Sequence, residues 1–303
     1  MESCFYSAKT NRKQARDRPM HKSRIFRSAA AVIAAGVLLA GCSQAPAEPG
    51  DSSSGRQTAA PVAPSGSPAA AGQSPKKPES GQDPSKLPVG SLYKNPSNNR
   101  NEIILADVRH TAVLIGDSQS EPMGSWPRGA LGSLGYKVYS VARGGTGYVA
   151  ATSSSGNYID ALQRGDWVLP YGTPPLIVVE GGGNDASHNA SDEQITANAN
   201  RLLAALKKRY PQAKLVMIGT LARGANAGGG RRTEVDALLG NIAAKAGAPF
   251  FSVGDWISKY QVAGDLVDGV HLNAAGHAKL TGVLAADMAA AGLSLQPGPR
   301  SAS

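Results

Sequence analysis

The order of hydrophobic and polar positions between residues 101 and 295 alternates short apolar runs with longer amphipathic segments. Five short runs, each rich in Val, Ile or Leu, predict strands that are covered on both faces. Five longer segments with apolar residues at helical spacing predict helices between them. Because strands alternate with helices, we expect one domain built on a parallel α/β sheet.

The individual elements follow from these runs and from the residues that begin and end them. The third helix is the best marked, because Ser191 and Gln194 form a capping box at its start and Pro211 follows its end. The predicted strands are Thr111–Ile115, Tyr136–Ala142, Leu176–Glu180, Lys214–Gly219 and Pro249–Val253. The predicted helices are Trp126–Leu134, Tyr158–Gln163, Asp192–Tyr210, Thr233–Ala246 and Ala274–Ala291.

Residues 43–100 have a different composition. They hold ten of the chain's 20 prolines, have Tyr93 as their single aromatic residue, and contain no Ile, Phe, Met or Trp. Such a segment buries too little apolar surface to offset the entropy of ordering, so we predict a disordered tether over residues 42–100. The folded domain is then expected at residues 101–295, with a flexible tail at 296–303.

The first 41 residues carry eight Lys or Arg and two acidic residues, so they supply +6 of the formal net charge of +9. After the basic stretch that begins at Met20, an uncharged apolar run extends from Ser28 to Gly41, which is the pattern of a signal peptide. This run is shorter than the roughly 20 residues that a bilayer-spanning helix needs. From Asn101 onward the chain has 17 basic and 16 acidic residues. The pI of 9.6 for the whole chain therefore reflects mainly the first 41 residues and does not indicate a nucleic-acid partner.

The sequence Leu39-Ala40-Gly41-Cys42 resembles the lipobox of bacterial lipoproteins. This resemblance implies that Cys42 receives a diacylglyceryl group and becomes the N-terminus after cleavage, and two acyl chains give stable anchoring. We therefore expect a protein held by lipid at the extracytoplasmic face of the cell membrane, with a secreted protein as the alternative. Residues 1–19 are not needed for such a signal, which makes Met20 an alternative start. Without Cys4 and with Cys42 lipidated, the domain has no disulfide.

Four polar segments lie where open α/β sheets bind ligands, at the ends of strands. Gly116-Asp117-Ser118 follows the first strand, where a serine has an exposed Oγ and a free N–H. The loop Gly144-Gly145-Thr146-Gly147 follows the second strand, and Gly182-Gly183-Asn184-Asp185 follows the third. Asp268 and His271 precede the last helix, and their spacing lets the carboxylate orient the imidazole while its other nitrogen faces a serine. Taken singly, each segment also fits an ordinary turn.

Other ligand chemistries are not indicated. The glycine loop lacks the spacing of a dinucleotide-binding fingerprint, and the chain contains no P-loop. It has neither an H-E-x-x-H motif nor a cysteine cluster, so we expect no metal and no cofactor. His110, His188 and His277 are interpreted as loop or packing residues.

Taken together and in this order, the four segments resemble the sequence blocks of the GDSL or SGNH hydrolase family, which is named for its Ser, Gly, Asn and His. The resemblance covers residues 110–292. It implies a flavodoxin-like three-layer α/β/α sandwich with a central parallel five-stranded sheet. It also implies that Ser118 is the nucleophile of a serine esterase, that His271 is its general base and acid, and that Asp268 orients the imidazole.

The resemblance further implies an oxyanion hole made of the N–H groups of Ser118 and Gly147 and the side-chain amide of Asn184. The family pattern N-x-G-x-x-G aligns with residues 142–147, with Ala142 in place of the usual Asn. Gly144 and Gly145 are therefore alternatives to Gly147.

The first block departs from the family as well, because Gln119 stands where Leu is more frequent. We expect a more polar substrate contact there, and Gln119, Tyr148 and Trp126 are the candidate substrate-binding residues. For Tyr148 and Trp126, a place in the hydrophobic core is an equally good interpretation.

The expected activity is hydrolysis of O-acyl esters through an acyl-enzyme intermediate. The short glycine-rich loops and the lack of a long apolar lid favour acetyl-type groups on a small-molecule or carbohydrate substrate. Lysophospholipase, thioesterase or lipase activity and acyl transfer to a sugar are the alternatives. A non-catalytic wall-binding lipoprotein is the least favoured alternative, because a binding protein has no need for all four segments.

Overall fold

The computed structural model describes residues 82–296. The expectations for the signal peptide, for Cys42 and for the tether up to residue 81 lie outside the described residues, as does the tail from residue 297. In the described part of the chain, no helix combines the length and hydrophobicity that a membrane span requires.

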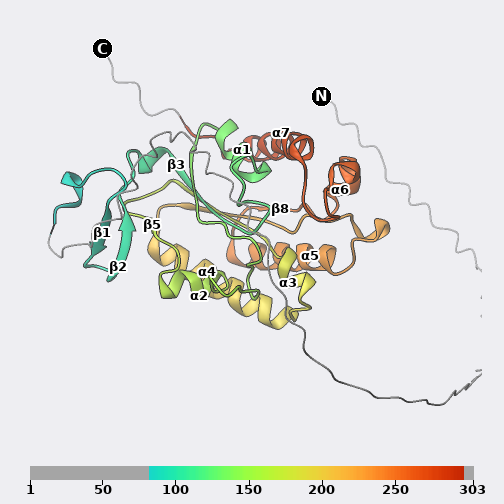
Figure 1. Ribbon diagram of the computed structural model, residues 1–303, viewed down its shortest axis with the longest axis horizontal. Coiled ribbons are helices and arrows are strands. Elements are labelled where there is room, and N and C mark those ends of the chain that lie inside the picture. Colours follow the sequence, from blue (N-terminus) through green and yellow to red (C-terminus); the bar gives the residue numbers. More distant parts are fainter. Residues whose placement is uncertain (1–81, 297–303) are drawn as a thin grey trace, which may run out of the picture. The chain divides into compact units, whose positions relative to one another are not determined.

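A five-stranded parallel sheet forms the centre of the described domain (Figure 1). Its strands are, in spatial order, β4 (Lys137–Ser140), β3 (Thr111–Ile115), β6 (Leu176–Glu180), β7 (Lys214–Ile218) and β8 (Phe250–Phe251). Each neighbouring pair is parallel. The prediction of a flavodoxin-like parallel sheet is confirmed, and the predicted strands β3 and β6 match at both ends.

Helices cover both faces of this sheet (Figure 1). One face carries α1 (Trp126–Ser133), α6 (Trp256–Lys259) and α7 (Ala274–Ala290). The other carries α2 (Tyr158–Arg164), α3 (Gly183–Ser187), α4 (Asp192–Arg209) and α5 (Gly230–Ala246). The capping box at Ser191 and Gln194 is present at the start of α4, as predicted. The short helices α3 and α6 are additions to the predicted set.

The two layers of core side chains follow from alternation along the buried strands. In β3, Ala112 and Leu114 pack in the cluster with α1 and α7, whereas Val113 and Ile115 pack in the cluster with α2, α4 and α5. Because both faces are covered, these four side chains are fully buried. This explains why the strand is an unbroken apolar run.

A second, smaller sheet corrects the predicted extent of the tether. Strand β1 (Leu92–Asn95) pairs antiparallel with β2 (Arg100–Ile103), and β5 (Leu169–Pro170) joins β2 in parallel. The prediction of disorder up to residue 100 is therefore wrong for this segment. Tyr93 is buried against Tyr171, with 4.9 Å between the ring centroids. One aromatic anchor thus orders a stretch whose average composition predicts disorder.

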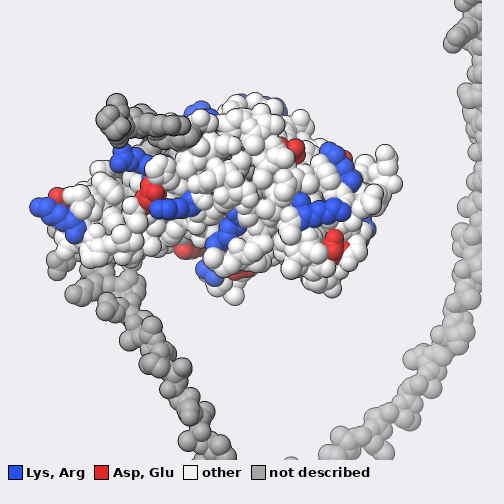
Figure 2. All heavy atoms as spheres, turned by 90° about the horizontal axis from the view of Figure 1, so that it is seen from above, with Lys and Arg blue, Asp and Glu red and all other residues white. Residues whose placement is uncertain are grey.

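Single turns of 3-10 helix complete the described elements, at Pro84–Lys86, Val108–His110, Ala225–Ala227 and Ala263–Asp265. On the face drawn in Figure 2, basic and acidic side chains lie interspersed among uncharged residues.

Candidate active site

The strand order places two of the predicted site segments at the switch point of the sheet. The chain enters at β3, adds β4 on one side and then crosses to add β6 on the other. The loops that leave β3 and β6 at their carboxyl ends therefore lie at the position where open α/β sheets bind ligands. Ser118 lies in the first of these loops, and Asn184 lies in the first turn of α3 after the second.

Ser118, His271 and Asp268 form one hydrogen-bonded series, although Ser118 and His271 are 153 residues apart in the chain. The distance from His271 Nε2 to Ser118 Oγ is 2.8 Å, and that from His271 Nδ1 to Asp268 Oδ2 is 2.6 Å. With Nδ1 protonated and donating to the carboxylate, Nε2 is free to accept the Ser118 proton. The arrangement thus has the geometry of a nucleophile, its base and an orienting group.

Asp268 remains ionised because its own turn stabilises the carboxylate. The hydrogen bond from His271 Nδ1 is the main cause that lowers the Asp268 pKa well below its usual range, and the backbone N–H groups of His271 and Val270 add to it. A carboxylate can therefore hold the imidazole in one tautomer and stabilise the imidazolium that forms when a serine loses its proton.

The loop that carries Ser118 is a tight turn closed by Asp117. The Asp117 carbonyl accepts hydrogen bonds from the N–H groups of Ser120 and Glu121, and its carboxylate accepts from the N–H of Gln119 at 2.8 Å. The N–H of Ser118 has no hydrogen-bond partner within the described residues. This N–H is therefore available to an oxyanion.

Gln119 is buried and hydrogen-bonded within the protein, which corrects the expectation of an open substrate-binding side chain. Its side chain is 3% exposed. Its amide nitrogen donates to the Val270 carbonyl at 2.9 Å, and its amide oxygen accepts from the Trp126 indole at 3.3 Å. Gln119 therefore joins the nucleophile turn to the turn that carries His271.

The two aromatic candidates for substrate binding are core residues, so that expectation is also wrong. Trp126 and Tyr148 are both fully buried. Trp126 begins α1 and packs against Trp256, whereas Tyr148 packs edge-on against Tyr158 with ring centroids 5.3 Å apart. Burial of the Tyr148 hydroxyl raises its pKa well above the usual range.

Asp185 fixes the glycine loop against α3. Its buried carboxylate accepts hydrogen bonds from three successive backbone N–H groups, those of Tyr148, Val149 and Ala150, at 2.7 to 2.9 Å. Gly147 lies against the same carboxylate, and a Cβ there would be 2.5 Å from Asp185 Oδ2. A glycine is therefore required at this position by close approach.

The predicted oxyanion donors differ in availability. The N–H of Gly147 donates to the Ala150 carbonyl at 3.0 Å, and that of Gly144 donates to the Glu121 carboxylate at 2.9 Å. In the described part of the chain, the N–H of Gly145 makes no hydrogen bond. Gly147, the first choice from the sequence, is thus engaged within its own loop in this structure, whereas its alternative Gly145 has a free donor.

Asn184 reaches both neighbouring loops. Its side-chain nitrogen donates to the Thr146 carbonyl at 2.9 Å and lies 3.4 Å from Asp117 Oδ2. The second contact is long for an N–H···O hydrogen bond. One amide hydrogen therefore positions the glycine loop, and the other is only weakly engaged and can donate to a substrate oxygen.

Two buried carboxyl groups support the nucleophile turn, Asp117 from within it and Glu180 from the end of β6. Burial raises the pKa of Asp117 to about 6. Burial, with the charge of Asp117 as a further cause, raises the pKa of Glu180 well above its usual range. The positive charge of Arg232 partly opposes both shifts. Because the pKa values are higher in the folded state than in the unfolded chain, the stability these groups contribute is lost as the pH rises through the raised values.

Sequence reasoning did not identify Glu180, Arg232 or Glu121 as parts of this region. Glu180 accepts a hydrogen bond from Ser120 at 2.8 Å, and Arg232 donates to the Gly183 and Leu221 carbonyls. The signal for Glu180 was present, since an acidic residue ending an apolar strand must find a partner. Arg232 and Glu121 lie on surface-like stretches and carry no such signal.

The remaining histidines are not members of the triad. His277 is partly buried and its Nδ1 accepts from the Trp126 N–H at 3.3 Å, while His110 pairs with Asp107 at 2.9 Å. His188 is exposed and contacts the Asn184 carbonyl. Within residues 82–296, no three His, Cys, Asp or Glu side chains are grouped so that they could hold a metal ion.

A parallel α/β sheet with a Ser-His-Asp series at its carboxyl edge defines the class of serine hydrolases. The model of the GDSL-like lipase/acylhydrolase family matches residues 114–279, which is more than half of the 303 residues. The chain belongs to this family, and the protein is a carboxylic ester hydrolase of the GDSL or SGNH type.

Comparison with solved structures finds distant likenesses. A family two carbohydrate esterase from Clostridium thermocellum is 16% identical with a TM-score of 0.49, over 61% of this chain and 65% of that one. TesA is 21% identical with a TM-score of 0.44, over 59% and 97%. An acetylxylan esterase, Axe2 from Geobacillus stearothermophilus, is 17% identical with a TM-score of 0.44, over 57% and 90%. No curated protein sequence matches the chain.

Replacing Asn184 by Ala should lower kcat roughly 10²- to 10³-fold if its amide donates to the oxyanion. Asn198→Ala is the matched control, because Asn198 also donates to the glycine loop, at the Tyr148 carbonyl, but lies on α4. Steady-state hydrolysis of nitrophenyl acetate measures both variants. Equal losses in the two would reduce Asn184 to a residue that supports the loop.

Replacing Gln119 by Leu should lower kcat roughly 10- to 100-fold with little change in KM, because the His271 turn loses its tether to the nucleophile turn and small misplacements are costly. Gln194→Leu removes the capping-box side chain of α4 and serves as the control, with lower thermal stability but unchanged kcat. Wild-type kcat in Gln119→Leu, with the protein folded, would show that the tether does not position the triad.

Proposed function

We propose that this protein is a serine esterase that removes short, acetyl-type acyl groups from hydroxyl groups of a carbohydrate or small-molecule substrate. In the proposed reaction, Ser118 Oγ attacks the ester carbonyl while His271 Nε2 takes its proton. His271 then protonates the departing alcohol, and a water molecule resolves the acyl-enzyme by the same steps. The 2.8 Å contact between Ser118 and His271 is the observation that carries this proposal.

Three groups are proposed to stabilise the negative charge on the carbonyl oxygen. The free N–H of Ser118 and the amide of Asn184 are two of them. The third comes from the glycine loop, where the sequence favours Gly147 and the free N–H of Gly145 supports the alternative. Donors that are already fixed by the fold need no reorganisation as the charge develops, which makes them effective.

The exposure of the triad supports a short acyl group. The side chains of His271 and Asp268 are 42% and 51% exposed. Glu121 brings a carboxylate to the Gly144 N–H, and Gly144 itself lies beside Ser118. A long acyl chain gains about 25 cal/mol for each Å² of apolar surface that it buries. An open site with a carboxylate at its edge offers little such surface, whereas a hydrophilic acceptor can approach it freely.

The acyl specificity is tested by hydrolysis of nitrophenyl esters from acetyl to decanoyl. We expect kcat/KM to be highest at acetyl and to fall with chain length. Ser118→Ala should reduce turnover by roughly 10³-fold or more, because no other group replaces the nucleophile. Ser133→Ala, an exposed serine on α1, is the matched control and should keep full activity. A maximum at octanoyl or decanoyl would overturn the short-chain proposal, and activity retained in Ser118→Ala would overturn the mechanism.

We also propose that the enzyme is exported and held at the outer face of the cell membrane by a lipid on Cys42. The basic stretch, the apolar run to Gly41 and the lipobox-like residues 39–42 support this. The Pro-rich residues that follow Cys42 would act as a tether and set the distance between the membrane and the folded domain.

Lipidation is tested by metabolic labelling of bacteria that express the full chain with radioactive palmitate. We expect label on the wild type and on Cys4→Ser, and none on Cys42→Ser. Cys42→Ser should also be absent from the membrane fraction, because stable anchoring requires two acyl chains and this variant has no lipidated cysteine. Label that persists in Cys42→Ser, or membrane retention without it, would contradict the proposal.

A further inference from the structure

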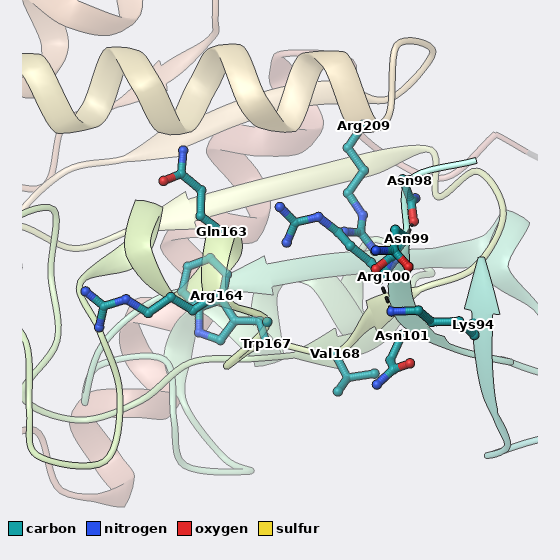
Figure 3. Close-up of a pocket in the computed structure, with 11 residues that line it drawn as sticks. Lys94, Asn98, Asn99, Arg100, Asn101, Gln163, Arg164, Trp167, Val168 and Arg209 are labelled. Atoms are coloured by element: carbon teal, nitrogen blue, oxygen red, sulfur yellow. Dashed lines mark hydrogen bonds between the residues drawn. The ribbon is translucent and has the colours of Figure 1, made fainter. Parts of the chain in front are cut away.

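A concave site lies where the small sheet meets the C-terminal ends of α2 and α4. The pocket has a volume of about 300 Å³. Four cationic side chains line it, those of Lys94, Arg100, Arg164 and Arg209 (Figure 3). None of its lining residues belongs to the triad or to the loops around Ser118. Helices of a parallel α/β sheet end at the edge opposite the carboxyl ends of the strands, so this pocket is separate from the esterase site.

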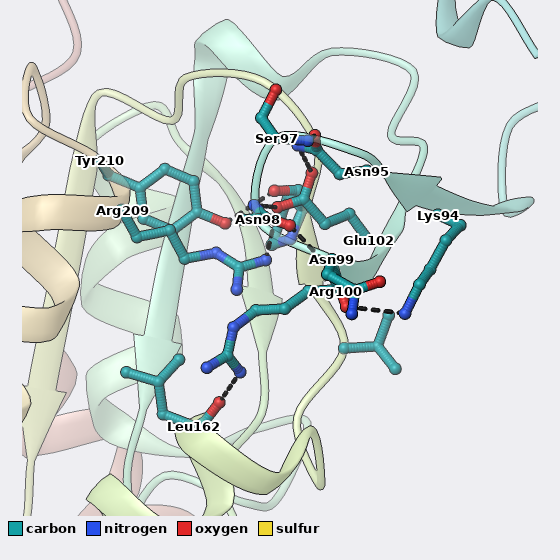
Figure 4. A network of polar contacts seen from close by, with 12 residues as sticks. Lys94, Asn95, Ser97, Asn98, Asn99, Arg100, Glu102, Leu162, Arg209 and Tyr210 are labelled. Carbon is teal, nitrogen blue, oxygen red and sulfur yellow. Dashed lines mark hydrogen bonds and ion pairs between the residues drawn. The ribbon is translucent and has the colours of Figure 1, made fainter. Parts of the chain in front are cut away.

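One of the four cations is neutralised within the fold. Arg209 is 10% exposed and pairs with the buried Glu102 at 2.8 Å. Asn95 and Asn98 also donate to the Glu102 carboxylate, at 2.8 and 2.9 Å (Figure 4). With the Arg209 charge and two amide donors, both oxygens of the Glu102 carboxylate have hydrogen-bond partners.

Two other cations have carbonyl partners only. Arg100 donates to the Leu162 carbonyl in the last turn of α2, and Lys94 Nζ donates to the Asn99 carbonyl at 2.7 Å (Figure 4). Among the described residues, neither forms an ion pair with a carboxylate, whereas Arg164 pairs with Asp160 at 3.4 Å. A helix C-terminus supplies at most about half a negative charge. The pocket therefore retains uncompensated positive charge.

The uncharged residues of the pocket suit a sugar. Asn99, Asn101 and Gln163 present exposed side-chain amides, which both donate and accept hydrogen bonds as hydroxyl groups require. Guanidinium and ammonium groups bind carboxylate and phosphate through charge-assisted hydrogen bonds. A pocket of this volume admits one anionic group with the sugar that carries it and is too small for a folded partner.

We propose that this pocket binds the carboxylate or phosphate group of an acidic carbohydrate. Lys94 and Arg100 hold the anionic group, and the amides contact the sugar hydroxyls. Binding here does not depend on the acyl-transfer steps proposed above.

Isothermal titration calorimetry of the full chain at low ionic strength tests the proposal. The probes are digalacturonate, glucose 6-phosphate, inorganic phosphate and neutral cellobiose. We expect at least one of the two sugar anions to bind more tightly than inorganic phosphate, no binding of cellobiose, and weaker binding as salt screens the charges. The anion that binds better identifies carboxylate or phosphate as the natural group.

Lys94→Gln should weaken binding of the preferred sugar anion about tenfold, the loss expected for one hydrogen bond between charged groups. Lys245→Gln removes the same charge from an exposed position on α5 and should bind like the wild type. Thermal unfolding confirms that both variants are folded. Ser118→Ala should bind normally, which separates this proposal from the esterase mechanism.

Three outcomes would overturn the proposal. They are the absence of binding for both sugar anions, binding that Lys94→Gln and Lys245→Gln leave equally strong, and binding of inorganic phosphate as tight as that of the sugar anions. The last outcome would mean a site for small anions without a sugar.

Discussion

The hydrogen bonds of the Asp185 carboxylate are the constraint on which the active-site edge depends. The three successive N–H groups directly after the glycine loop donate to it, and the carboxylate is fully buried. A buried carboxylate is tolerated only with such donors, and removing them would leave an expensive unpaired charge. Because Asp185 follows Asn184 in α3, the loop after β4 and the amide after β6 are positioned as one unit. The nucleophile turn after β3 lies between them.

Polar contacts of the same kind join the remaining parts of the site. Gln119 connects the Ser118 turn to the His271 turn through the Val270 carbonyl, and Asp117 closes the serine turn from within. These contacts are mostly with backbone groups, so they hold whole loops rather than single side chains. Burial raises the pKa values of Glu180 and Asp117, and hydrogen bonds from Ser120 and from the Gln119 N–H partly oppose these shifts. The His271 and Asp268 side chains stay exposed, and Ser118 is half-buried.

The opposite edge of the domain uses a buried carboxylate in a similar way. Glu102 gathers Arg209 and two asparagine amides and so joins the small sheet to the end of α4. The hairpin that results brings Lys94 and Arg100 to the end of α2, where their charges are not matched by carboxylates. The candidate active site and the cationic pocket thus arise from separate structural units, at opposite edges of the main sheet.

The sequence by itself determined the main sheet and the set of chemical groups. Unbroken apolar runs such as residues 111–115 and 176–180 specify strands buried on both faces. The motifs that follow these strands contain Ser118 and Asn184, and the motif before the last helix contains His271. Local pattern carries this information because strand burial and turn chemistry are local. The tertiary structure decided which groups are free to act. It buried Gln119, Trp126 and Tyr148, engaged the N–H of Gly147, and ordered β1 around Tyr93. These outcomes depend on contacts between segments distant in sequence, such as Gln119 with Val270, and composition averages or neighbouring residues do not encode them.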